Sequence, residues 1–257
     1  MFRSQFSVYQ RQVDLREEDR IALLEQWKNS GAKPEITSWW IGYFKVHQLE
    51  GSDETGDGSV NAPFKSIQKA VNSVPPGGIA LIELLDDYVC SKDTPNREII
   101  ADRRVELYGA LDSSNQPQFK LYNSSEVGGK SGILVGSNAV VRVRDLVVES
   151  NDNGNTVVHW KMLFKVAIAQ AGSSLIIGRY DSSNTTKIVL NDVELVDFES
   201  SIAEFLIEKT DIDAPGHDSN NPLNLIYDRA DRKVVFHKSN VSDLTGGGVN
   251  IPVSGLI

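Results

Sequence analysis

Between residues 79 and 257 the chain alternates short apolar segments with polar loops, and no segment there has the periodicity of a long helix. Residues 141–144, with the sequence VRVR, alternate strictly, which places two valines on one face and two arginines on the other. This pattern predicts an all-β fold. The predicted strands are residues 79–85, 105–108, 118–122, 133–135, 140–149, 164–169, 175–177, 187–198, 223–227 and 233–236.

Three of these segments align with one another: VRVRDLVVES at 141–150, IVLNDVELVD at 188–197 and VVFHKSNVSD at 234–243. The matching positions Val143, Leu190 and Phe236 lie 47 and 46 residues apart. A strand, a polar corner and a second strand that recur in this way predict a β-solenoid with coils of about 23 residues, half that spacing. The alternative is a β-sandwich, which would favour Asn-Gly or Asp-Gly hairpin turns between its strands.

Residues 42–78 contain a turn-rich loop, GSDETGDGS at 51–59, followed by a predicted helix over 61–74. The helix carries an apolar stripe and ends at the PPGG sequence of 75–78. A helix in this position would cover the open end of a solenoid, where apolar side chains and strand edges are otherwise exposed. The residues of the stripe are Phe64, Ile67, Ala70, Val71 and Val74.

The succession GSD, GDGS, PFKSIQKAV, PGG, IALIELL and Tyr88 resembles the first segment of the right-handed parallel β-helix, or pectin-lyase-like, superfamily. The resemblance implies a right-handed single-stranded parallel β-helix over residues 42–257, with 42–78 as its opening loop and capping helix. This superfamily contains polysaccharide lyases, esterases, hydrolases, phage tailspikes and structural proteins. The resemblance therefore indicates a fold more specifically than an activity.

Residues 1–41 form a separate predicted segment. A capping box at Asp14 and Glu17 begins a helix that ends at Gly31. The sequence ITSWWIGYF at 36–44 follows, and its rings either cover the core of the next domain or dock on another protein, since Trp and Tyr dominate interface hot spots. The candidate docking residues are Trp27, Trp39, Trp40, Tyr43 and Phe44.

Charge and composition limit the partners that we expect. The chain has 26 basic and 35 acidic residues, a net charge of -9, and no basic stripe, which disfavours nucleic acid. The longest apolar run, 79–85, is interrupted by Glu83, and the N-terminus lacks the apolar stretch of a secretory signal, so we expect neither membrane insertion nor secretion. Cys90 is the only cysteine, which excludes an internal disulfide and a cysteine zinc site. The chain therefore fits a reducing cytosol.

The catalytic clusters of the superfamily are found only as fragments. Asp197 and Phe198 match part of an esterase-like motif, Gly216–Asp218 match part of a polygalacturonase-like motif, and Asp192 and Glu194 form a simple carboxylate pair. The loop of Asp53 and Asp57 is either a calcium ligand set or an ordinary turn. We therefore assign no catalytic residue, no metal ligand and no cofactor, and enzymatic activity is the less favoured reading.

Together, these features favour a non-enzymatic structural protein of a bacteriophage virion: a tailspike, a fibre, or a capsid-attached appendage or adaptor. The resemblance implies docking to other virion proteins through residues 1–41, a homotrimer, synthesis in the host cytoplasm, and a host surface glycan as a further partner. Two alternatives remain open, a polysaccharide-degrading enzyme of the same fold and a glycan-binding adhesin.

Overall fold

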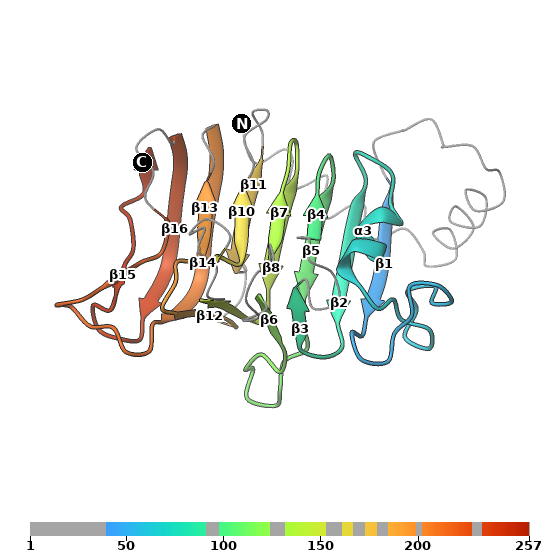
Figure 1. The fold of residues 1–257 in the computed structure, drawn as a ribbon, viewed down its shortest axis with the longest axis horizontal. Coiled ribbons are helices and arrows are strands. Elements are labelled where there is room, and N and C mark those ends of the chain that lie inside the picture. The colour runs from blue at the N-terminus through green and yellow to red at the C-terminus, as the bar shows by residue number, and fades with distance from the viewer. Residues whose placement is uncertain are drawn as a thin grey trace.

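The computed structural model describes residues 40–90, 98–123, 132–152, 161–166, 173–178, 185–198, 202–227 and 233–256. Its strands follow one another along the long axis of the molecule and stack in parallel in three walls (Figure 1). Wall 1 contains β1 (Ile41–Val46), β2 (Ile79–Leu84), β5 (Arg104–Tyr108), β8 (Val140–Arg144) and β11 (Ser174–Gly178). Wall 2 contains β3 (Tyr88–Cys90), β6 (Lys120–Asn123), β9 (Val147–Asn151) and β12 (Thr186–Asn191). Wall 3 contains β4 (Glu98–Ile100), β7 (Ile133–Val135), β10 (Phe164–Val166) and β13 (Val196–Phe198).

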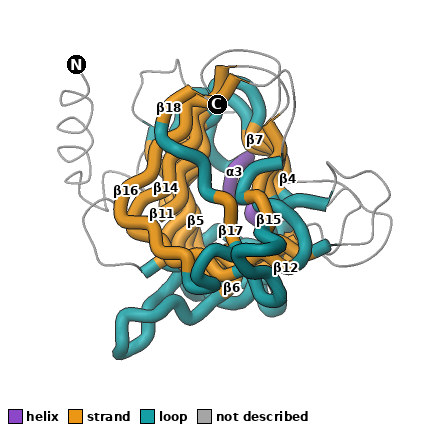
Figure 2. Tube along the Cα trace, turned by 90° about the vertical axis from the view of Figure 1, so that its left-hand side faces the viewer, coloured by secondary structure: helices purple, strands orange, loops and turns teal. Residues whose placement is uncertain are grey.

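The order of pairing shows that the chain winds around one axis. The chain runs through β2, β3 and β4 and then through β5, β6 and β7, and each strand of the second set pairs in parallel with its counterpart in the first. The next set, β8, β9 and β10, stacks on β5, β6 and β7 in the same way. Viewed along the stack, β5 and β11 lie on one side of the interior and β4 and β7 on the other (Figure 2). The all-β parallel solenoid is therefore confirmed, and the sandwich alternative is wrong.

The coils are longer than the repeat predicted. Ile79 pairs with Arg104, 25 residues later, and Arg104 pairs with Val140, 36 residues later. The aligned positions do not stack on one another, because Val143 lies in wall 1 whereas Leu190 lies in wall 2. The aligned segments resemble one another because each contains a strand, a corner and a second strand, but these strands belong to different walls. The predicted coil length of about 23 residues is therefore wrong.

The last two coils merge walls 1 and 2 into continuous strands. β14 (Ile202–Asp213) and β16 (Lys233–Asp243) pair in parallel along nearly their whole length. Each strand turns from one wall to the next at a residue in the left-handed region, Lys209 with φ 45° and Asn240 with φ 53°. The two turning residues lie opposite each other, so the corner is stacked like the strands.

The C-terminal residues pack on the last coil. β15 (Leu223–Asn224) pairs in parallel with β17 (Val249–Asn250), and β18 (Gly255–Leu256) pairs antiparallel with β16. The carboxylate of Asp243 accepts hydrogen bonds from the backbone N–H groups of Thr245 and Gly247, each at 2.9 Å, which fixes the intervening glycine-rich turn.

The interior is filled by inward-pointing aliphatic and aromatic side chains. Phe205 of β14 lies between two other rings, with centroid distances of 5.7 Å to Phe198 and 5.5 Å to Phe236. All three rings are buried. This stack joins walls 1 and 3 in the last coils.

At the other end, the aromatic segment forms β1, and the helix is shorter than predicted. α3 (Ile67–Asn72) begins after Ser66, whose side chain accepts a hydrogen bond from the backbone N–H of Lys69. The predicted first turn is not helical because Phe64 forms a parallel β-bridge with Val46. α3 contacts β1, β2 and β4 and is seen between walls 1 and 3 in Figure 2.

A buried hydrogen-bond network joins α3 to the first full coil. The Tyr88 hydroxyl donates to the Glu98 carboxyl at 2.7 Å and accepts from the backbone N–H of Ile67 at 3.1 Å. Burial raises the pKa of both Tyr88 and Glu98. The Glu98 carboxyl, which is 8% exposed, thus takes a hydrogen bond from Tyr88 in addition to one from the backbone N–H of Gln68.

Tyr88→Phe is expected to lower the free energy of unfolding by about 1–3 kcal/mol, because it removes one hydrogen bond from the buried Glu98 carboxyl and leaves the Ile67 N–H without its acceptor. Chemical denaturation followed by circular dichroism measures this loss. The control is Tyr122→Phe on the outer face of wall 2, which should change the free energy by less than about 0.5 kcal/mol. Equal losses in the two variants would contradict the role of the Tyr88 hydroxyl.

Candidate functional site

The aromatic residues predicted for docking include both buried and exposed rings in the structure. Tyr43 points outward from β1 and is 37% exposed, whereas Phe44 points inward, is 5% exposed, and packs at 5.5 Å from the ring of Phe64. Trp40 is half-buried and packs against the core. Strand alternation therefore makes Phe44 a core residue of this chain and leaves Tyr43 as the exposed ring. Two of the candidates lie outside the described residues, Trp27 and Trp39.

The outer face of wall 1 carries a row of charged and aromatic side chains across successive coils. Lys45 forms an ion pair with Glu83 of the next coil. The Arg144 guanidinium donates to the Glu106 carboxylate at 2.5 Å and lies over the Tyr108 ring, 4.5 Å from its centroid. Burial, and then the charge of Glu83, raise the pKa of Tyr108 to about 12. These contacts join neighbouring coils on this face.

The corner after β8 holds a second set of contacts to the same arginine. Arg144 also donates to Asp145, which turns the chain in the left-handed region with φ 56°. The Asp145 carboxylate accepts from the Thr185 hydroxyl at 2.5 Å, and its backbone N–H donates to the Thr186 hydroxyl at 2.9 Å. These contacts make the corner a structural element that links walls 1 and 2.

One carboxyl on the same wall has no such contacts. Glu208 of β14 is 7% exposed, and its Oε2 atom has no hydrogen-bond partner among the described residues. Burial raises the pKa of Glu208, and the nearby positive charges of Arg142 and Lys209 act in the opposite direction. Arg142 is half-buried on β8, and no hydrogen bond or ion pair joins its guanidinium to another described residue. Strand alternation in the sequence predicted the outward position of Arg142, but nothing in the sequence indicated Glu208.

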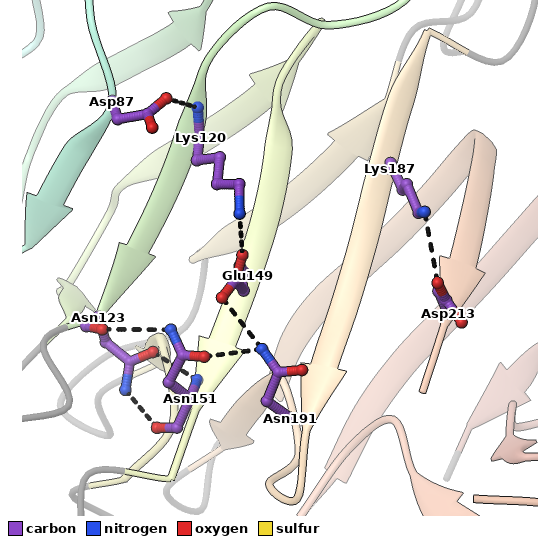
Figure 3. Close-up of polar contacts among 8 residues, drawn as sticks. All are labelled: Asp87, Lys120, Asn123, Glu149, Asn151, Lys187, Asn191 and Asp213. Atoms are coloured by element: carbon purple, nitrogen blue, oxygen red, sulfur yellow. Dashed lines mark hydrogen bonds and ion pairs between the residues drawn. The ribbon is translucent and has the colours of Figure 1, made fainter. Parts of the chain in front are cut away.

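The outer face of wall 2 carries two ion pairs between coils (Figure 3). Lys120 of β6 contacts Glu149 of β9 at 3.0 Å, and Lys187 of β12 contacts Asp213 of β14 at 3.3 Å. The backbone N–H of Lys120 also donates to Asp87 at 2.9 Å. Charged side chains on this wall therefore connect one coil to the next.

Three asparagines form a ladder at the end of the wall 2 strands (Figure 3). The side chain of Asn123 donates to the backbone carbonyl of Asn151 at 2.8 Å and accepts from its N–H at 2.7 Å. Asn191 continues the ladder by donating to the Asn151 side chain at 2.7 Å and to Glu149 at 3.0 Å. Amide stacking of this kind satisfies the polar groups of the corner and holds the coils in register.

The fragments of catalytic motifs lie in structural positions. Asp192 turns the corner after β12 with φ 57°, and its carboxylate lies 3.2 Å from Nε2 of His217. Nδ1 of His217 lies 3.0 Å from the backbone oxygen of Asn221, so both ring nitrogens contact oxygen atoms of neighbouring residues. The Glu194 carboxyl is half-buried, and burial raises its pKa.

The Asp53 carboxylate is occupied by the start of α3. It accepts hydrogen bonds from the backbone N–H groups of Lys65 at 2.9 Å and Ser66 at 3.0 Å, and from the Ser66 hydroxyl at 2.5 Å. Asp57 accepts from the N–H of Ser59 at 2.9 Å, which is the contact of an ordinary turn. Over the described ranges, no group of three or more His, Cys, Asp and Glu side chains is arranged to hold a metal ion.

No protein-family model, curated protein or solved structure matches this chain. In the part of the chain that the structure describes, no helix has the length and apolar character needed to cross a membrane. The features of the described residues that bear on function are the contacts of walls 1 and 2, the exposed Tyr43 and the buried Glu208 carboxyl.

Proposed function

We propose that this chain is a non-enzymatic structural protein of a bacteriophage virion that docks to the particle through its N-terminal segment. The observation that carries the proposal is the use of outward charged groups as links between coils. Lys45 with Glu83, Arg144 with Glu106, and Lys120 with Glu149 each join neighbouring strands. Pairs of this kind link successive coils of a solvated rod, and pairing occupies these acids and bases.

The docking role is supported by the position of Tyr43. It lies on the first strand of the solenoid, directly after residues 1–39, and its ring is partly exposed. Partly exposed aromatic rings are common anchors of protein interfaces. In this proposal the particle-binding surface comprises residues 1–39 and the outer side of β1, the assembly is a homotrimer made in the host cytoplasm, and the partners are other virion proteins.

Deletion of residues 1–39 tests the docking role. The cut precedes Ile41 because β1 belongs to the solenoid and pairs with β2 over its whole length. We expect the truncated chain to keep the far-ultraviolet circular dichroism signal of its β-strands. We expect its incorporation into particles to fall by about tenfold or more. Quantitative mass spectrometry of purified virions measures the incorporation.

The full-length variant Tyr43→Ala should also lower incorporation, whereas Tyr122→Ala on wall 2 should leave it unchanged. A folded truncated chain that enters particles normally would contradict the docking role. Light scattering of the full chain tests the trimer independently.

A second candidate function is glycan binding on the side of the solenoid. The observation that favours it is the presence on wall 1 of Arg142 and Glu208, which no hydrogen bond or ion pair joins in the part of the chain that the structure describes, although the charge of Arg142 acts on Glu208. This function and the docking role are compatible, because they use different parts of the chain.

A further inference from the structure

The large apolar side chains that the structure leaves exposed lie toward the two ends of the rod. At the C-terminal end they are Leu244, Val253 and Leu256, each more than half exposed. In the first coil and the loop that opens it they are Tyr43, Leu49, Val60 and Ile99. Among the described residues between 101 and 243, no large apolar side chain is exposed to this degree. Because exposed apolar side chains that gather in one region mark interaction surfaces, the ends are better candidates for binding than the sides.

The last long strand is only partly covered at the C-terminal end, which Figure 2 views along the stack. β16 pairs with β14 over ten residue pairs, whereas β18 pairs with its other side at Val235 and Phe236. The backbone N–H of Lys238 donates to the Ser254 hydroxyl at 3.1 Å, and the run 237–240 is exposed. Part of the last strand therefore remains open to contact from outside the chain.

Lys238 gives this end an accessible positive charge. It is the register partner of Ile207, which is buried and points inward, so strand alternation directs Lys238 over the end of the interior. Lys238 is exposed, and its hydrogen bond to Ser254 uses the backbone, which leaves its ammonium group accessible to a partner. Two carboxylates near the same end, those of Asp218 and Asp243, each accept hydrogen bonds from at least two backbone N–H groups.

The loop at 47–62 lies beyond the first strand, at the N-terminal end of the rod (Figure 1). β2 pairs with one side of β1, and on the other side the backbone N–H of Lys45 donates to Gly58 at 2.7 Å. The backbone carbonyl of Lys45 accepts from the N–H of Phe64 at 3.0 Å. The loop therefore presents its own side chains at this end.

This loop carries negative charge. It contains no Lys or Arg and four acidic residues: Glu50, Asp53, Glu54 and Asp57. Asp53 accepts hydrogen bonds from the start of α3, whereas Glu50 and Glu54 are exposed. Exposed Leu49 is adjacent to Glu50 in the sequence. The N-terminal end thus offers carboxylates and an apolar side chain, which complement the ammonium group and apolar side chains of the C-terminal end.

A single row of register partners leads from this loop to Lys238. The backbone of Gly58 lies against the Phe44 ring at the start of the row. The row then contains one residue from each coil: Phe44, Ile82, Leu107, Val143, Ile177, Ile207 and finally Lys238. A second copy placed in line along the rod axis would therefore bring its opening loop to Lys238 of the first copy.

We propose that the C-terminal end of one copy binds the N-terminal end of a second copy, so that rods of this chain stack head to tail. Lys238 faces the carboxylates of Glu50 and Glu54, and apolar side chains of both ends are removed from water at the contact. Since the two surfaces differ and lie at opposite ends, the contact does not close on itself and repeats along one axis. The inference goes beyond the proposed function, which places particle docking in residues 1–39 and the outer side of β1.

Other partners fit the two ends less well. Two C-terminal ends in contact would bring the Lys238 charges together, and two N-terminal ends would bring two acidic loops together, so both arrangements are repulsive. An anionic polymer would meet Lys238 but would be repelled by the net charge of -9. A second copy in line supplies the opposite charge and an apolar surface at the same contact.

Sedimentation of the full chain measures the stacking. Over about 1 μM to 1 mM, we expect the average mass to rise continuously with concentration instead of stopping at a fixed number of chains. Lys238→Glu should weaken the association by about tenfold or more, because it places a carboxylate against the acidic loop. The control Arg104→Glu makes the same change of net charge at an exposed position on the side of the rod, and it should change the association by less than about twofold.

Exchange of the two charges tests which surfaces meet. Glu54→Lys should weaken the association by about threefold or more. An equimolar mixture of Lys238→Glu and Glu54→Lys should associate again, because the altered C-terminal end of one variant meets the altered N-terminal end of the other. Val253→Ser, at a position that is 80% exposed, should leave the thermal midpoint unchanged and weaken the association. Electron microscopy should show rods joined at their ends.

The outcomes separate stacking from the proposed function. A mass that does not rise with concentration would overturn the stacking. A rise that is equal in the wild type, Lys238→Glu and Val253→Ser would mean that the chains meet through other surfaces, and it would overturn the stacking as well. A closed trimer of constant mass would support the oligomer of the proposed function and contradict stacking. Stacking by a chain that is absent from virions would leave this inference intact and contradict the virion role.

Discussion

Phe205→Ala is expected to destabilise the protein by about 3–5 kcal/mol, the cost of truncating a fully buried ring. The ring lies between Phe198 and Phe236, so its removal leaves a cavity in contact with walls 1 and 3 at once. Because parallel coils stabilise one another only through their neighbours, the loss should appear as earlier unfolding of the C-terminal coils. Urea denaturation monitored by tryptophan fluorescence and by hydrogen exchange measures both effects.

The matched control is Leu206→Ala, the next residue in the same strand. Leu206 points outward and is half-buried, so its truncation should cost about 1 kcal/mol or less. Equal losses at the two positions would mean that the inward and outward faces of β14 are assigned wrongly.

Gly178→Ala is expected to disrupt the solenoid, because the backbone of the next coil leaves no room for a Cβ atom at this position. A Cβ atom at this position would lie 1.7 Å from the backbone oxygen of Glu208 and 2.7 Å from the Thr210 hydroxyl. The residue also has φ +97°, a conformation that costs an L-residue about 1–3 kcal/mol by itself. The combined effect should separate β11 from β14 and reduce the yield of folded protein, as measured by soluble expression and the thermal midpoint.

Gly216→Ala separates the two causes. Gly216 has φ +88°, and a Cβ atom there would meet nothing within 4 Å. This variant should therefore show only the conformational cost, about 1–3 kcal/mol, and stay folded. Similar midpoints for the two alanine variants would contradict the close approach of the backbones at Gly178.

The strands of the solenoid could be predicted because they have a local signature, whereas their parallel stacking was expected from the resemblance of the first segment to the β-helix superfamily. The strand at 133–135 was predicted with its observed bounds, and β2 and β5 within one residue at each end. Alternation in the sequence VRVR also assigned the faces of β8 correctly, with Val141 and Val143 buried. The position of a strand and the face on which each side chain lies depend on residues that are adjacent in the sequence, so both can be predicted from one sequence.

β14 was missed because its outward positions carry charged side chains. Ala203, Phe205 and Ile207 point inward, but Glu204 and Glu208 alternate with them and interrupt the apolar run. The coil length was missed for a different reason. The connections between strands differ in length from coil to coil. Similar units of strand, corner and strand therefore recur in the sequence at a spacing that differs from the number of residues in one coil.

The candidate site could be predicted only in part. Alternation placed Arg142 on the outer face, but its relation to Glu208 depends on the pairing of β8 and β14 through β11. That pairing brings together residues far apart in the sequence, and no local pattern encodes it. For the same reason the sequence could not show that Phe44 faces the core while Tyr43 faces outward until β1 was known to be a strand.

Coil length varies while strand register does not, and this has a practical consequence for protein engineering. From β2 to β5 the chain uses 25 residues and from β5 to β8 it uses 36, yet both pairs stay in register over five residues. The exposed turn at 112–116 is part of the longer coil, and the Asp112 carboxylate closes it by accepting hydrogen bonds from the backbone N–H groups of Ser114 and Gln116. A foreign peptide inserted at this turn would be displayed on the side of the rod, because the strands on either side keep their pairing when the length of the connecting loop changes.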